Sequence, residues 1–92
     1  MSKTLVIKTP NLTWSELSAV FNRASPYHTG NLVERPWCEY VMVTPTGVYY
    51  LPHQPVFETA DSVIWIDESS WAEVTLLTDK LSLTQLIEYF SN

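Results

Sequence analysis

The chain has a single cysteine, two glycines and no long uninterrupted apolar run. Cys38 has no second cysteine with which to form a disulfide inside the chain, which fits a reducing compartment. Two glycines are too few for a glycine-rich loop that cradles phosphates. The first residues lack the apolar core of a signal peptide, and no stretch has the ~18 apolar residues of a membrane span. We therefore expect a cytoplasmic protein with no membrane partner.

What the chain does contain is enough apolar material for one folded domain. Of its 92 residues, 46% are apolar and 13% are aromatic, so the burial of a core offsets the entropy lost on ordering the chain. A chain of this length buries roughly 60 to 65% of its unfolded surface. Residues 1–92 are predicted to form a single domain.

Charge is distributed unevenly along the chain, whose formal net charge is −5. Residues 1–30 carry three cations against one carboxylate, and residues 31–92 carry nine carboxylates against two cations. From residue 58 to 79 there are six carboxylates and no lysine or arginine. Affinity for nucleic acid phosphates comes from lysine and arginine. We therefore expect no direct nucleic acid binding by this half, and a basic protein surface suits it better.

The first third of the chain predicts a strand followed by a helix. Residues 3–8 form a short β-branched and aliphatic run that we expect Pro10 to end. Thr13 and Glu16 form a capping box, which predicts a helix start. Residues 25–36 are interpreted as a loop. The apolar residues that flank the box or recur at helical spacing after it are Leu12, Trp14, Leu17, Val20, Phe21 and Ala24.

Four further strands and a second helix are predicted in the rest of the chain. The strands are residues 37–44, 48–51, 62–67 and 71–77. The first has apolar side chains on both faces, which is typical of a central strand, and Pro45-Thr46-Gly47 predicts a tight turn after it. The last strand is open to another interpretation, because Ser70-Trp71-Ala72-Glu73 also resembles a helix start. The second helix begins at a capping box formed by Ser82 and Gln85, and its apolar face is Leu83, Leu86, Ile87 and Phe90.

Together these elements predict an α+β fold. The expected architecture is a mostly antiparallel sheet of four to five strands with two helices packed on one side, in the order β-α-β-β-β-β-α.

Groups suited to catalysis are few. His28 and His53 lie in predicted loops without neighbours at metal-ligand spacing, and are interpreted as solvated. Cys38 lies in a predicted central strand, where a thiol is usually buried. Ser69-Ser70 lack the Gly-x-Ser-x-Gly context of a hydrolase nucleophile, and Asp67-Glu68 are more typical of a solvated turn than of a cation site. We expect no enzyme activity, cofactor, metal or small-molecule substrate.

The aromatic residues divide into core and surface candidates. Trp14 and Trp65 fall in periodic segments and are interpreted as core residues. Trp37 and Trp71 stand at element edges, where tryptophan is often found in binding hot spots. Tyr49-Tyr50 are consecutive, so in a strand one of them points away from the core. The candidate aromatic anchors are Tyr49 and Trp71.

The carboxylates of residues 58–79 are the clearest functional signal. Carboxylates spread along a strand and its turns imitate the charge of a phosphate backbone, and they suit lysines that normally hold nucleic acid. A solvated acidic face is the plainer interpretation. The candidate contact residues are Glu58, Asp61, Asp67, Glu68 and Glu73.

With its length, acidity, aromatic content and lack of an enzyme motif, the chain resembles the small proteins that phages use against bacterial defence, most of all the type I-F anti-CRISPR proteins. The box at Thr13-Trp14-Ser15-Glu16 and the acidic stretch are this sequence's own features, and no family residue is carried over. The resemblance implies a non-enzymatic phage inhibitor, acting in the host cytoplasm, that binds the RNA-guided surveillance complex and blocks pairing of target DNA with the guide.

Two other functions stay open. One is a general interaction module, such as an antitoxin-like partner or a small subunit, that binds through its sheet and aromatic residues. The other is a minimal enzyme that depends on His53 and Cys38. Reversal of Asp67 and Glu68 to lysine is expected to weaken the inhibitor, whereas removal of Tyr49 or Trp71 is expected to weaken the interaction module.

Overall fold

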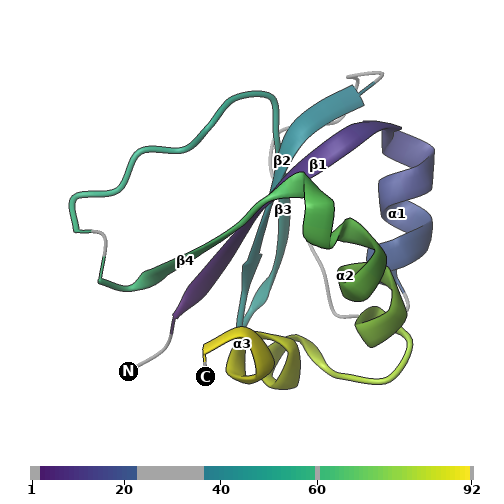
Figure 1. Cartoon of the computed structure of the whole chain (residues 1–92). Coiled ribbons are helices and arrows are strands. Elements are labelled where there is room, and N and C mark those ends of the chain that lie inside the picture. Colours follow the sequence, from purple (N-terminus) through teal and green to yellow (C-terminus); the bar gives the residue numbers. More distant parts are fainter. Residues whose placement is uncertain (1–2, 23–36, 60, 92) are drawn as a thin grey trace.

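The computed structural model describes residues 3–22, 37–59 and 61–91, which form a four-stranded mixed sheet with three helices (Figure 1). The elements are β1 (Thr4–Thr13), α1 (Trp14–Asn22), β2 (Trp37–Thr44), β3 (Gly47–Leu51), β4 (Val63–Ile66), a short 3-10 helix η1 (Glu68–Ser70), α2 (Trp71–Thr78) and α3 (Leu83–Ser91). The predicted loop over residues 25–36, with His28 in it, lies outside the described residues. The α+β class is as predicted.

The strands lie in the order β3-β2-β1-β4. β2 is antiparallel to both of its neighbours, and it is central, as its two apolar faces predicted. β4 pairs with β1 in parallel, so the sheet is mixed, and the predicted antiparallel pairing holds for β1 with β2 and for β2 with β3 but not for β4. The reason lies in the connection: after the β2–β3 hairpin the chain crosses to the far edge of the sheet and there runs in the direction of β1.

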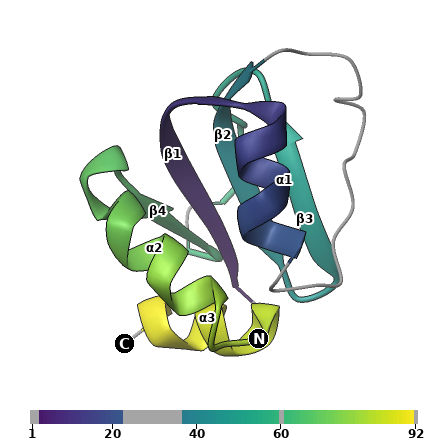
Figure 2. The same ribbon diagram turned by 90° about the vertical axis from the view of Figure 1, so that its right-hand side faces the viewer.

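Strand register arranges the core residues in two rows across the sheet. One row is Tyr50, Val41, Ile7 and Ile66, and the other is Val48, Val43, Leu5 and Ile64. The helices cover these rows with Leu17, Phe21, Val74, Leu83, Leu86 and Ile87, all buried in the same cluster. All three helices therefore pack on one side of the sheet, as Figure 2, viewed from that side, shows for α1 and α2.

Both predicted capping boxes are present. The Thr13 amide donates to Glu16 Oε1 at 2.9 Å, and the Glu16 amide donates to Thr13 Oγ1 at 3.3 Å. In the second box the Ser82 amide donates to Gln85 Oε1 at 2.9 Å, and the Gln85 amide donates to Ser82 Oγ at 3.3 Å. Each box satisfies amides that have no partner inside the helix, and α1 and α3 begin where the boxes predict.

The prediction of a fifth strand over residues 71–77 is wrong, because this segment forms α2. Its buried residues Val74 and Thr78 are four apart, which is helical spacing. The threonines that favoured a strand are accommodated by bonds to the preceding turn. Thr75 Oγ1 donates to the Ala72 carbonyl at 2.9 Å, and Thr78 Oγ1 donates to the Thr75 carbonyl at 2.8 Å.

The first strand does not end before Pro10. β1 runs on to Thr13, with an irregularity in its pairing to β2 between Lys8 and Leu12. A proline is tolerated at such an irregularity because it has no amide hydrogen to donate to the neighbouring strand.

Candidate docking surface

The side of the sheet that faces away from the helices carries its own rows of side chains. Alternation along each strand places them opposite the core rows. We call this surface the aromatic face, and its residues are Val6, Lys8, Tyr40, Met42, Tyr49, Leu51 and Trp65. One row runs across all four strands as Tyr49, Met42, Val6 and Trp65. Three aromatic residues from three strands thus share one surface.

In the row across the aromatic face, exposure is greatest at the edge strand β4. Val6 in the middle is fully buried among its neighbours, and Met42 and Tyr49 are partly buried. Trp65 on β4 is 46% exposed. A large apolar side chain is therefore open to a partner at this edge.

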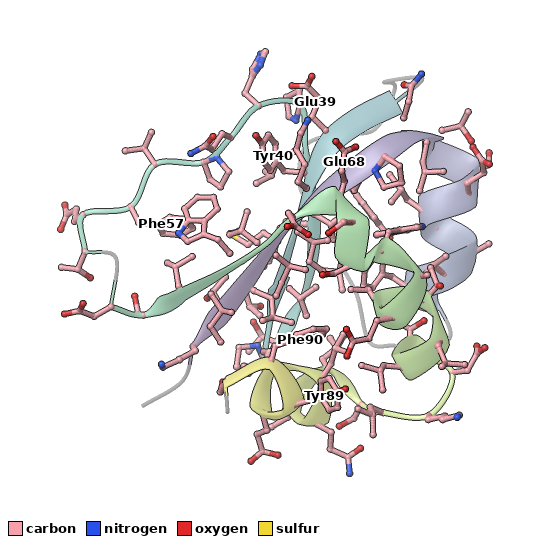
Figure 3. All side chains as sticks on the ribbon, in the orientation of Figure 1. Glu39, Tyr40, Phe57, Glu68, Tyr89 and Phe90 are labelled. Carbon is pink, nitrogen blue, oxygen red and sulfur yellow. The ribbon has the colours of Figure 1, made fainter. Side chains whose placement is uncertain are left out.

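The segment 52–59 between β3 and β4 lies on the same side of the sheet as the aromatic face (Figure 1). It is tied to that face at two points. The Tyr40 hydroxyl donates to Gln54 Oε1 at 3.3 Å, and the Phe57 and Trp65 rings meet edge to face with centroids 6.0 Å apart. Figure 3 shows Phe57 directed from this segment toward the sheet. Val56, between the two ties, is 94% exposed and adds apolar surface.

One cation already rests on an aromatic ring of this face. Lys8 Nζ lies 5.0 Å from the centroid of the Tyr40 ring, within the range of a cation–π contact. The arrangement follows from register, because Lys8 and Tyr40 are paired residues on β1 and β2.

The candidate carboxylates do not form a single patch. Glu58 and Asp61 are exposed ahead of β4, and Asp67 and Glu68 are exposed after it. Asp61 and Asp67 are six positions apart, which is about 20 Å along an extended chain. Glu73 lies on α2, on the helical side of the sheet. Four of the five carboxylates thus flank β4 in two pairs, one at each end.

Asp67 is held by the turn that follows β4. Ser69 Oγ donates to Asp67 Oδ1 at 2.6 Å, and Ser70 Oγ donates to the same oxygen at 3.3 Å. These bonds, that of Ser69 above all, lower the pKa of Asp67, so its charge is retained in mildly acidic solution.

Glu73 takes part in a contact between two helices. The Tyr89 hydroxyl of α3 donates to Glu73 Oε2 at 2.6 Å, and this bond together with the carboxylate charge raises the pKa of Tyr89. Tyr89 is 47% exposed, and Leu76, one turn after Glu73, is 57% exposed. The helical side therefore has exposed apolar side chains of its own.

Trp65 and Trp71 exchange the roles expected of them, and the side chains of Trp14 and Trp37 lie outside what the structure describes. Trp65 was predicted to be a core residue, yet it is exposed, because Ile64 and Ile66 are the residues of β4 that pack against the core. Trp71, a candidate anchor, is partly buried against the core, with its ring edge to face with Phe21 at 6.2 Å. Tyr49 points away from the core and Tyr50 is buried within it, as the consecutive tyrosines predicted.

The structure describes only part of the set of residues considered for catalysis. His53 is exposed in the segment after β3, and the side chain of Cys38 lies outside what the structure describes. Within residues 3–22, 37–59 and 61–91, no three side chains of His, Cys, Asp or Glu gather into a possible metal site. In the same ranges, none of the helices has the length and apolar character needed to cross a membrane.

The aromatic face was not apparent from the sequence, because its rows join residues from four strands. The signal that sequence reasoning missed is the alternation of side chains along β4. Ile64 and Ile66 pack against the core, so Val63, Trp65 and Asp67 lie on the opposite face. No protein-family model, curated protein or solved structure matches the chain.

Proposed function

We propose that this chain is a non-enzymatic binding protein that docks on a basic, nucleic-acid-binding protein assembly through the aromatic face and the carboxylates beside it. The observation that carries the proposal is Trp65: a half-exposed indole on an edge strand, in a row with Tyr49. Tryptophan and tyrosine supply a large contact area at low cost in side-chain entropy, and they are enriched in binding hot spots.

Charge selects the kind of partner. Glu58 and Asp61 stand at one end of β4, and Asp67 and Glu68 stand at the other. A partner whose lysines and arginines lie on either side of an apolar ridge is complementary to this arrangement. Such pairs at an interface rim speed association and make it sensitive to salt.

The resemblance to type I-F anti-CRISPR proteins names the assembly to test first, the RNA-guided surveillance complex. In this proposal the chain occupies basic residues along the DNA path and prevents target DNA from pairing with the guide. The chain is then a phage protein that inhibits host immunity in the bacterial cytoplasm by binding the complex stoichiometrically.

The test is a binding measurement between the purified chain and the guide-loaded type I-F complex, with and without labelled target DNA. We expect association that weakens as salt is raised, and loss of DNA binding in proportion to the bound chain. Replacement of both Tyr49 and Trp65 by alanine is expected to weaken association at least ~30-fold, since a hot-spot aromatic contributes about 2 kcal/mol or more.

The matched control replaces two exposed apolar residues of the helical side, Leu76 and Tyr89, by alanine. This control is expected to bind as the unchanged chain does. The proposal is refuted if the control loses binding while the Tyr49 and Trp65 variant keeps it, or if DNA binding is unaffected by saturating chain.

A second candidate function is favoured by the apolar character of the aromatic face itself. A general interaction module, such as an antitoxin-like protein or small subunit, binds through Tyr49 and Trp65 with little need of charge. Reversal of Asp67 and Glu68 to lysine separates the two functions. Binding that withstands this reversal and high salt, but not the loss of Trp65, favours the module.

A further inference from the structure

We infer that Trp65 receives an arginine side chain of the partner protein, with Glu58 and Asp61 as neighbouring carboxylates. This inference rests on the proposed function, because it names the side chain that the docking surface binds. It arises from the β4 edge of the aromatic face, where the exposed indole of Trp65 and the exposed carboxylates of Glu58 and Asp61 belong to one stretch of chain.

The indole is presented in a fixed orientation. Phe57 packs against Trp65 with an angle of 78° between the ring planes, and Val6 lies beside Trp65 in register on β1. With its plane set by these neighbours and 46% of its surface exposed, the indole needs little reordering when a partner arrives. Among aromatic side chains, indole is the strongest cation–π acceptor.

The carboxylates come from the chain on either side of this contact. Glu58 follows Phe57, the residue whose ring contacts Trp65, and is exposed. Asp61 is exposed two residues before β4. Both carboxylates belong to the stretch of chain that leads into β4, so they attract a cation toward this edge of the sheet, whereas an aliphatic partner side chain would leave them without a countercharge.

Arginine fits this site better than lysine. A guanidinium group is planar and stacks on an aromatic face while its N–H groups still reach a carboxylate in a forked geometry. An ammonium group is a compact, strongly hydrated charge that gives up more water on binding. The aromatic face also holds its own lysine, Lys8, on Tyr40, which leaves the Trp65 ring for a cation from outside.

The experiment is a nuclear magnetic resonance titration of the full chain with a peptide of alternating arginine and glycine, and with the matching lysine peptide. The Trp65 indole N–H signal is assigned by its loss in Trp65→Phe. We expect the arginine peptide to shift this signal and to bind more tightly than the lysine peptide, by no more than the about two- to fivefold that a whole exposed cation–π contact of roughly 0.5 to 1 kcal/mol is worth.

Two variants make the test specific. Glu58→Gln is expected to weaken binding of the arginine peptide, whereas Glu88→Gln, which removes an equal charge from α3, is expected to leave it unchanged. Trp65→Leu keeps an apolar side chain and is expected to abolish the preference for arginine. The inference is overturned if the two peptides bind with equal affinity, or if the resonance shifts centre on Tyr89 and Leu76 on the helical side of the sheet.

The inference and the proposed function fail in different ways. If Trp65→Ala abolishes binding to the surveillance complex while the two peptides bind equally, the docking surface stands and arginine recognition is refuted. If the arginine peptide is preferred while the complex does not bind, arginine recognition stands and the proposed partner is refuted.

Discussion

Glu16 and Gln85 occupy the same position in two capping boxes, but only one of them can titrate. Hydrogen bonds from Thr13, first from its amide and then from its hydroxyl, lower the pKa of Glu16. A carboxyl group with a lowered pKa in the folded state contributes stability above the ordinary glutamate pKa, about 4.3. That contribution is lost as the pH falls through the lowered pKa.

We therefore predict that acid removes part of the stability supplied by the first box and none of that supplied by the second. The free energy of unfolding in urea, compared between the unchanged chain and Glu16→Gln, is expected to differ most near pH 6 and least near about pH 3. Gln85→Glu, the reciprocal change, is expected to give the second box the same pH dependence. A constant difference between the chain and Glu16→Gln across this range contradicts the prediction.

Single residues also show where the sequence misleads. The sequence places Trp65 in a periodic apolar segment and Trp71 at the edge of an element, yet Trp65 is half exposed and Trp71 packs against Phe21. Tryptophan is the larger side chain, yet in β4 it is the smaller Ile64 and Ile66 that pack against the core. Which face of a short strand is buried depends on the neighbouring strands, and these are distant in the sequence.

At the scale of elements, local signals were the reliable ones. The capping boxes place the starts of α1 and α3 because the bonds that define them join residues three apart. The parallel pairing of β4 with β1 joins residues almost sixty positions apart, and nothing local encodes it. The segment 71–77 was ambiguous for the same reason, because burial of Val74 and Thr78 against other elements decides for a helix.

The bond between Tyr89 and Glu73 ties α3 to α2 and gives the helical side its own pH dependence. The hydrogen bond, and then the charge of Glu73, raise the pKa of Tyr89 above its ordinary value of about 10. A raised pKa in the folded state means that stability is present below the ordinary value and is lost as the pH rises through the raised one.

We predict that Tyr89→Phe removes this alkaline loss. The free energy of unfolding of the unchanged chain is expected to fall more steeply above about pH 10 than that of Tyr89→Phe. Glu73→Gln serves as the control, and in an absorbance titration of tyrosinate it is expected to return the pKa of Tyr89 toward its ordinary value. If the free energy of unfolding falls equally for the chain and for Tyr89→Phe as the pH rises above about 10, the bond between Tyr89 and Glu73 does not contribute as predicted.

At the scale of the whole molecule, the two sides of the sheet carry different sets of side chains. One side carries the cluster that holds the three helices, with Leu86 fully buried in it. The other side carries Trp65 and the segment 52–59. Because the two sets of side chains share a backbone but not a surface, stability and docking are expected to respond to different substitutions.

The prediction that tests this separation compares three substitutions in urea unfolding. Leu86→Ala is expected to cost about 2 to 5 kcal/mol, because it removes buried contacts and leaves a cavity. Against a total of roughly 5 to 15 kcal/mol, that is a large share. Leu76→Ala, at a site 57% exposed, is expected to change stability by no more than about 0.5 kcal/mol.

Trp65→Leu shows whether Trp65 contributes to stability, because the same substitution is used to test the preference for arginine and must leave the fold intact. Its indole is half exposed and its loss opens no cavity in the cluster beneath the helices, so we expect a cost below about 1 kcal/mol. A cost similar to that of Leu86→Ala means that Trp65 is a structural residue held by Phe57 and Val6, and that its exposure serves the fold rather than a partner. A small cost leaves the indole free for binding, since an exposed apolar side chain that adds little stability has its clearest physical use at an interface.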